Sequence, residues 1–231
     1  MAIEPVIGAR EQILGRIRTA LGDVPAAERA TDVPVPRDYR RTGELAAGDE
    51  RLVARLTERL RDYRADVIRC PDAQIGARIA TACLERGLRR LAIPPALEPA
   101  WHPPGVELVA DTGCTPAELD ALGAALTGCA AAIAETGTLV LDGGPRCGRR
   151  ALTLIPDHHI CVVERRQIVQ LVPEGLAVVG PAGGEPGRPL TLISGPSASS
   201  DIELTRIEGV HGPRHLLVVI AEPGPRAVRC R

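Results

Sequence analysis

The sequence contains no lysine, so all 28 of its basic residues are arginine. A chain without lysine cannot form a Schiff base through a lysine amine. It also cannot build the lysine-bearing phosphate loop of P-loop nucleotide hydrolases. Both classes of chemistry are therefore excluded before any motif is considered.

Aromatic residues are scarce as well, at 1% of the chain, with no Phe and only Trp101, Tyr39 and Tyr63. Single-stranded nucleic acid is bound on clustered aromatic side chains, and duplexes are bound by a positive field. The formal net charge here is −1, so neither feature is present. We therefore expect no nucleic-acid partner.

Long apolar runs are missing too. The longest weakly polar stretch, Cys129–Leu141, is interrupted by Glu135–Gly137, whereas a membrane helix needs roughly 18 apolar residues. The N-terminus has no basic region followed by an apolar run, so we expect no signal peptide and a cytoplasmic protein.

Cysteine is present seven times, but no two cysteines have the C-x-x-C spacing of a metal site. An odd number of thiols in a cytoplasmic protein is typical of buried, reduced side chains that pack as small hydrophobes. We expect this chain to hold no metal and no iron–sulfur cluster.

What is present is enough apolar material, 45% of 231 residues, for one large domain. Apolar residues recur at helical spacing over Ile7–Leu21, and a proline-containing stretch follows. We predict an N-terminal helical arm over 1–43, an α/β domain over 44–221 and a flexible tail over 222–231.

Within the domain, helical and strand-like patterns alternate, which favours an α/β layer fold with a largely parallel sheet. We expect helices over 44–63, 72–85 and 115–126, a helical segment beginning over 167–172 and a surface loop over 176–187. The expected strands are 65–69, 90–93, 106–110, 130–134, 138–141, 151–155, 160–164, 190–194 and 215–220.

Three loops carry the candidate chemistry. In the first, Glu135 could act as nucleophile or general base, and Gly137 could turn the backbone amides toward an anion beside the hydroxyls of Thr136 and Thr138. The alternative is a tight turn between buried strands, which the pattern alone favours.

The second loop carries the neighbouring histidines His158 and His159 after Asp157. Adjacent residues of a strand face opposite sides, so both rings cannot point into one site. A single pair lacks a full set of metal ligands, so one histidine satisfied within the structure is the favoured interpretation.

The third loop begins at Ser194 and Gly195 and continues through Ser197 to Asp201 and Glu203. Its serines could cap a helix whose N-terminus holds an anion, although the two acidic residues would repel one. Shortly after it, His211 stands between turn residues and could be exposed beside the strand ends.

Four of these segments occur in one order: Ala134–Thr138, Pro156–Ile160, Ile193–Ser197 followed by Ser200–Glu203, and Gly209–Pro213. Together they resemble the lactate utilization protein C family, the LUD-domain family, over roughly residues 44–221. The resemblance implies a three-layer α/β/α fold of the NagB/RpiA/CoA-transferase type.

The resemblance also implies a cytoplasmic role in oxidising L-lactate to pyruvate beside iron–sulfur proteins, which would hold the clusters. A small carboxylate is the ligand that such a role suggests. Glu135 and His211 lie at motif positions that the resemblance maps, and we take them as the candidate catalytic residues. The candidate ligand-binding residues are Thr136, Gly137, Thr138, His159, Ser194, Gly195, Ser197, Asp201, Glu203 and Gly212.

A second hypothesis is a freestanding enzyme related to the CoA transferases and to formyltetrahydrofolate cyclo-ligase. Glu135 would then be the reacting group, with Gly137 and Thr138 as an oxyanion cradle. This hypothesis rests on analogy of fold alone.

Overall fold

In the computed structural model the chain divides into two compact units, residues 1–39 and 40–231. The structure describes residues 8–25, 35–180, 188–199, 207–208 and 211–224. In the first unit, α1 spans Ala9–Ala20, which confirms the predicted helix, and leaves Ile13 and Ile17 exposed. No helix in the described ranges is long and apolar enough to span a bilayer.

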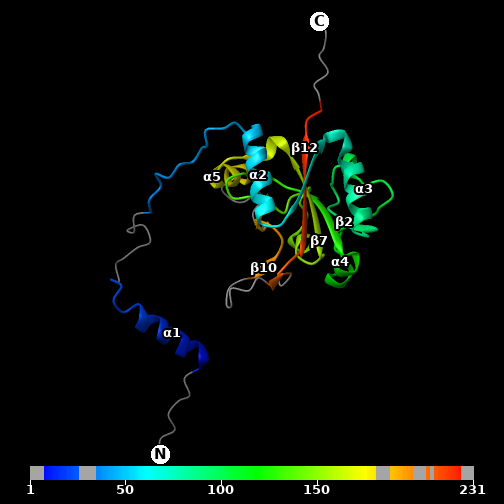
Figure 1. The fold of residues 1–231 in the computed structure, drawn as a ribbon. Helices are drawn as coiled ribbons and strands as arrows, with labels where there is room; N and C mark the ends of the chain where they lie inside the picture. The colour runs from blue at the N-terminus through cyan, green and yellow to red at the C-terminus, as the bar shows by residue number, and fades with distance from the viewer. Residues whose placement is uncertain (1–7, 26–34, 181–187, 200–206, 209–210, 225–231) are drawn as a thin grey trace, which may run out of the picture. The chain divides into compact units, whose positions relative to one another are not determined.

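The second unit is built on a six-stranded sheet in the order β1-β12-β7-β4-β2-β3, with every pair parallel. The strands are β1 (Asp66–Pro71), β2 (Arg90–Ile93), β3 (Glu107–Ala110), β4 (Ala124–Gly128), β7 (His158–Glu164) and β12 (His215–Glu222). Parallel strands need helices on both faces, and Figure 1 shows α2 and α3 on opposite sides of β12.

Successive residues of the central strands pack into different cores. Ile160 and Val162 of β7 pack with α3 (Ile75–Glu85) and with Trp101, whereas Cys161 and Val163 pack with α2 (Glu50–Asp62). Strands buried on both faces carry continuous apolar runs, as the sequence of β12 does. The predicted three-layer α/β/α architecture is confirmed.

A second, four-stranded sheet lies on the α2 side, in the order β8-β5-β6-β9. Its strands are β5 (Ala131–Ile133), β6 (Thr138–Leu141), β8 (Ile168–Val169) and β9 (Thr191–Ile193). One face of this sheet packs with α2 over the main sheet, and the other packs against α5 (Val172–Val179). A separate short ribbon pairs β10 (Ala198–Ser199) with β11 (Ile207–Glu208).

One prediction of local structure is wrong at the centre of the main sheet. The helix expected over 115–126 is α4 (Pro116–Leu122), which Thr115 and Glu118 begin with reciprocal capping bonds. Gly123, at a φ of 69°, ends it, and β4 begins at the next residue. All five residues of β4 are buried, and an apolar run of that length has no period that separates strand from helix.

Three other predictions are wrong in the second half of the domain. Residues 151–155 are not a strand, because Arg150–Thr153 form a 3₁₀ turn. Residues 167–171 hold the end of a 3₁₀ turn and β8 instead of a helix, and α5, which begins at Val172, runs to Val179 into the stretch 176–187 expected as a loop. After Gly195 the described chain continues as β10, and the helix that the serines could cap, with Asp201 and Glu203 in its first turn, lies outside the described residues.

The cysteines are buried, as expected: among the described residues, five of six are in the core and Cys114 is half-buried. Burial raises the pKa of the Cys83 thiol to about 11. The pKa of Cys129 is raised further, by its contact with Cys161 and by desolvation.

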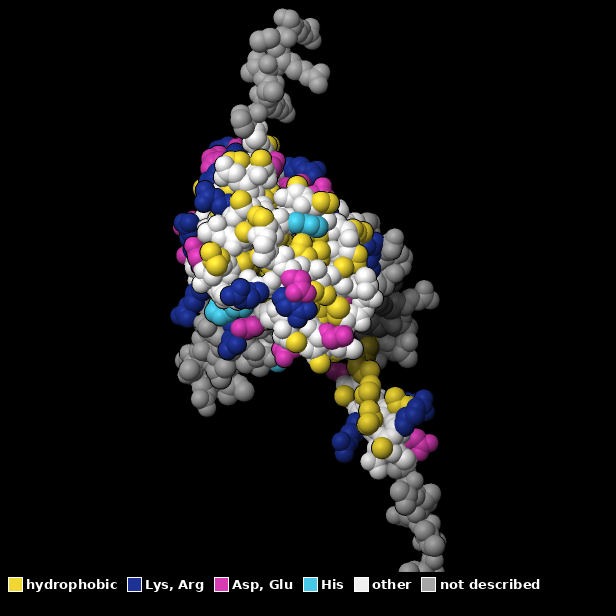
Figure 2. All heavy atoms as spheres, turned by 90° about the vertical axis from the view of Figure 1, so that its right-hand side faces the viewer, with side chains coloured by type: hydrophobic (Ala, Val, Ile, Leu, Met, Phe, Trp, Pro, Cys, Tyr) yellow, Lys and Arg dark blue, Asp and Glu magenta, His cyan; other side chains and the backbone are white. Residues whose placement is uncertain are grey.

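On the face shown in Figure 2, basic and acidic side chains are interspersed with apolar ones. Neither sign of charge gathers there, which agrees with the near-zero net charge of the chain. This face therefore has no basic patch of the kind that binds a polyanion such as a nucleic acid.

The turn that contains Gly137 offers a test of how the small sheet is anchored. Gly137 has a φ of 66°, and a Cβ built there would lie 2.7 Å from Cβ of Arg59 in α2. Gly137→Ala should lower the free energy of unfolding by the strain of the left-handed backbone, about 1–2 kcal/mol, and by about 1–3 kcal/mol of overpacking. Urea unfolding measures the sum.

The matched control is Gly87→Ala. Gly87 has a φ of 68° but no atom within 4 Å of the added Cβ, so only the backbone strain applies. If both variants lower the free energy of unfolding equally, the added Cβ at Gly137 causes no overpacking against α2, and the prediction is contradicted.

Candidate functional site

The predicted site residues from the second and third loops meet in one cavity of about 300 Å³. It lies beside the amino ends of β7 and β12, under β9 and the segment after it. Sequence-predicted residues that line it are His159, Ser194, Gly195, Ser197, His211 and Gly212. Asp201 and Glu203 lie outside the described residues.

His159 is the most deeply buried polar group of this cavity, with 1% of its surface exposed. As residue periodicity predicts, His158 turns to the opposite face of β7. In β4, Thr127 places its Oγ1 2.8 Å from Nε2 of His159. Burial lowers the pKa of His159 to about 4, so the ring is neutral at physiological pH.

The proton on this ring can be assigned from the bonding around it. Thr127 Oγ1 has no other acceptor among the described residues, so the satisfied arrangement has Thr127 donating to Nε2. The ring proton then sits on Nδ1. Nδ1 is buried and has no hydrogen-bond partner in the described parts of the chain.

The first loop is the hairpin turn between β5 and β6, as the turn interpretation predicts. It reaches the cavity wall through hydroxyl groups: Thr136 Oγ1 lies 2.7 Å from Thr138 Oγ1, which lies 2.8 Å from Ser194 Oγ. Gly195, at a φ of 85°, packs against Tyr63 at the end of α2. The first and third loops are therefore held together.

Glu135 is not among the residues that line the cavity. Its carboxylate is exposed and lies 3.3 Å from Nη2 of Arg40. Its assignment as a nucleophile or base stays a prediction, without support from burial or from a neighbouring cavity.

His211 lines the cavity from the rim. Its side chain is exposed, and its backbone N–H donates to Ser197 Oγ at 3.1 Å. The structure therefore places His211 where a ligand could reach it, and its catalytic assignment stays a prediction.

Sequence reasoning missed two contributors, Arg150 and Thr127. Arg150 lines the cavity, but it is one of 28 arginines and no motif distinguishes it. Thr127 comes directly after the helix expected over 115–126, and the sequence predicts no strand there, so its pairing with His159 across two parallel strands is not visible from the sequence. Only the register of β4 against β7 reveals it.

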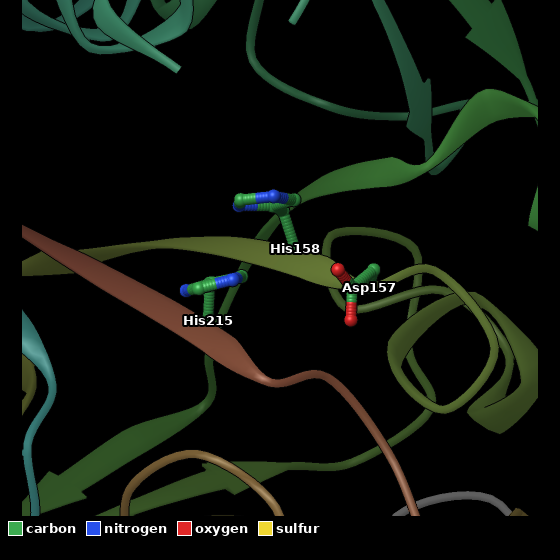
Figure 3. A group of neighbouring side chains, drawn as sticks. All are labelled: Asp157, His158 and His215. Carbon is green, nitrogen blue, oxygen red and sulfur yellow. The ribbon is translucent and has the colours of Figure 1, made fainter. Parts of the chain in front are cut away.

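The opposite face of the same sheet edge carries a group of possible metal ligands, Asp157, His158 and His215 (Figure 3). Their ligand atoms all lie within 4.8 Å of one another. Arg214, however, donates to both carboxylate oxygens of Asp157, at 2.6 and 2.9 Å, and holds the pKa of that carboxyl below its ordinary value.

The two rings of that group stack at a centroid distance of 4.3 Å with an angle of 16° between their planes. A metal ion lies in the plane of each imidazole that binds it, and two nearly parallel planes at this spacing do not meet at one ion. As arranged, these residues form an ion pair beside a ring stack. The prediction that this chain holds no metal stays a prediction.

A second cavity, of about 240 Å³, lies at the carboxyl ends of β7 and β12, where α/β sheets commonly bind ligands. Three of the four charged residues that line it form ion pairs, and the fourth, Asp72, is exposed to solvent. Arg165 contacts Glu222 at 2.8 Å, and Glu164 contacts Arg146 at 3.2 Å and Arg166 at 2.8 Å. The cavity beside His159 is therefore the better candidate site.

Comparison with known proteins agrees with this fold. The family model described as the LUD domain matches residues 53–221. A lactate utilization protein C of Deinococcus radiodurans is 42% identical over 92% of this chain and 95% of its own length. An uncharacterized protein of Neisseria meningitidis is 29% identical over 94% of this chain and 95% of its own.

Among solved structures, a DUF162 family protein from Deinococcus radiodurans is similar, with 39% identity and a TM-score of 0.64. The match covers 74% of this chain and 96% of that one. The fold and the site thus define a LUD-type α/β protein. This chain belongs to the LUD domain family.

The buried histidine generates a prediction about stability and pH. An unfolded histidine binds a proton near pH 6.5, whereas folded His159 does so only near pH 4. Between these values the unfolded state binds more protons, so the free energy of unfolding falls as the pH falls. The full loss from this residue is about 3 kcal/mol.

The measurement is urea unfolding from pH 7 to pH 4 for the wild type and for His159→Gln, which should lose this part of the slope. His102→Gln, at an exposed histidine, is the control and should keep the wild-type slope. A His159→Gln variant with the wild-type slope would contradict a neutral buried ring.

Proposed function

We propose that this chain serves in L-lactate utilization, as a cytoplasmic subunit of a system that oxidises lactate to pyruvate with iron–sulfur partner proteins. The observation that carries the proposal is the match over 92% of the chain, at 42% identity, to a protein named lactate utilization protein C. The LUD domain match over residues 53–221 supports it.

The chemistry of the step explains why partners are needed. Oxidation of lactate to pyruvate removes two electrons and two protons, so an electron acceptor must take part. Iron–sulfur clusters are held by thiolates. The described cysteines of this chain are spaced apart in sequence, and burial raises the pKa of Cys70, Cys83 and Cys147, which keeps them as thiols. Clusters in partner proteins would fill that role.

The test is to purify the tagged full-length chain from its native host grown on L-lactate. We expect co-purifying proteins with the visible absorption of iron–sulfur clusters, and dye-linked lactate oxidation by the eluate. The same chain purified alone should show neither, because the electron carriers are absent from it.

Growth of a strain lacking the gene provides the second measurement. The strain should fail to grow on L-lactate and recover when the gene is restored, while growth on another carbon source serves as control. Undiminished growth on L-lactate, or a colourless and inactive eluate, would contradict the proposal.

A further inference from the structure

The cavity beside His159 has a charge pattern suited to a monoanion. Its described lining contains no Asp or Glu, one arginine, two histidines and the hydroxyl groups of serine and threonine. Such a lining has one permanent positive charge and several neutral hydrogen-bond groups.

The positive charge belongs to Arg150. Its guanidinium has no carboxylate partner among the described residues. The preceding residue differs: Arg149 donates to both carboxylate oxygens of the buried Asp111, at 2.7 and 2.9 Å. Arg149 is thus paired within the protein, whereas the guanidinium of Arg150 is available to pair with a ligand. The planar fork of a guanidinium matches a carboxylate.

The neutral donor is Nδ1 of His159, which Thr127 leaves carrying the ring proton. A buried donor without an acceptor is costly, and such groups in native proteins call for a partner. Because the ring is uncharged at physiological pH, a neutral oxygen, such as a hydroxyl or keto oxygen, is a suitable acceptor.

The rest of the lining limits the size and polarity of the ligand. Leu216 and Ile193 are apolar, and Leu154 and Leu192 expose 40% and 51% of their surface. A volume of about 300 Å³ admits a short carbon chain.

We propose that this cavity binds a short-chain 2-hydroxy or 2-oxo monocarboxylic acid. Its carboxylate pairs with Arg150, and its oxygen at carbon 2 accepts a hydrogen bond from Nδ1 of His159. Ser194, held by the hydroxyl chain from Thr138, stands in the wall beside it. The choice of lactate and pyruvate as probes rests on the proposed function, whereas the acid class rests on the cavity.

The experiment is isothermal titration calorimetry of the purified full chain with L-lactate and pyruvate. Two further probes each remove one feature: propionate lacks the oxygen at carbon 2, and L-lactamide lacks the charge. We expect saturable binding of L-lactate or pyruvate, and affinities about tenfold lower or worse for both reduced probes.

Variants locate the site. Arg150→Gln should weaken binding of the acid about tenfold or more, since the charge-assisted fork is lost. Arg55→Gln is the matched control, because Arg55 is exposed on α2 away from the cavity, and it should bind like the wild type. The 15N resonance of His159 Nδ1 should shift when the acid is added, which tests the donor without replacing it.

Three results would overturn the inference: no saturable heat with either acid, unchanged affinity in Arg150→Gln, or inorganic phosphate binding more tightly than the acids. Failure here is separable from failure of the proposed function. If the chain captures partner proteins but binds neither acid, only the acid-binding proposal is contradicted. If it binds an acid but captures no partner proteins, only the proposed function is contradicted.

Discussion

The pairing of β7 with β4 on one side and β12 on the other is the constraint on which the site depends. Because β7 is buried on both faces, its register cannot slip by one residue without turning every core side chain the wrong way. That register sets His159 beside Thr127 and sends His158 to the other face, against His215. One strand thus determines the chemistry of both faces of the sheet edge.

The two faces then differ in how completely their polar groups are satisfied. On the α3 side, Asp157 and Arg214 form a forked ion pair, and the two histidine rings stack. On the α2 side, a buried ring nitrogen and an arginine are left without partners in the described chain. Unsatisfied polar groups are uncommon in folded proteins. Arg150 is exposed to solvent, so Nδ1 of His159 is the buried unsatisfied group among the described residues of this cavity, and it is the reason why this face is our candidate site.

The sequence predicted the layered α/β class, the start of a helix at Thr115 and Pro116, and the turn around Glu135, because each has a strong local pattern. It did not predict β4, whose short apolar run has no period. The site follows the same rule. His159 and Ser194 lie in sequence motifs and could be predicted. Arg150 is identified only by its position in the folded chain, and Thr127 only by its contact with His159 on a neighbouring strand. Contacts between distant strands have no local signature that a single chain can reveal.

The buried thiols have a consequence for how the protein meets oxidants. A protonated thiol sealed in a core reacts slowly with disulfides and alkylating agents, since the thiolate is the attacking species. Cys129 and Cys161 are sealed between the main sheet and α2. They become reactive only when that layer separates. The rate at which the native protein takes up a thiol reagent, beyond the reaction of the half-buried Cys114 and of Cys230, which lies outside the described residues, therefore reports how often the core opens.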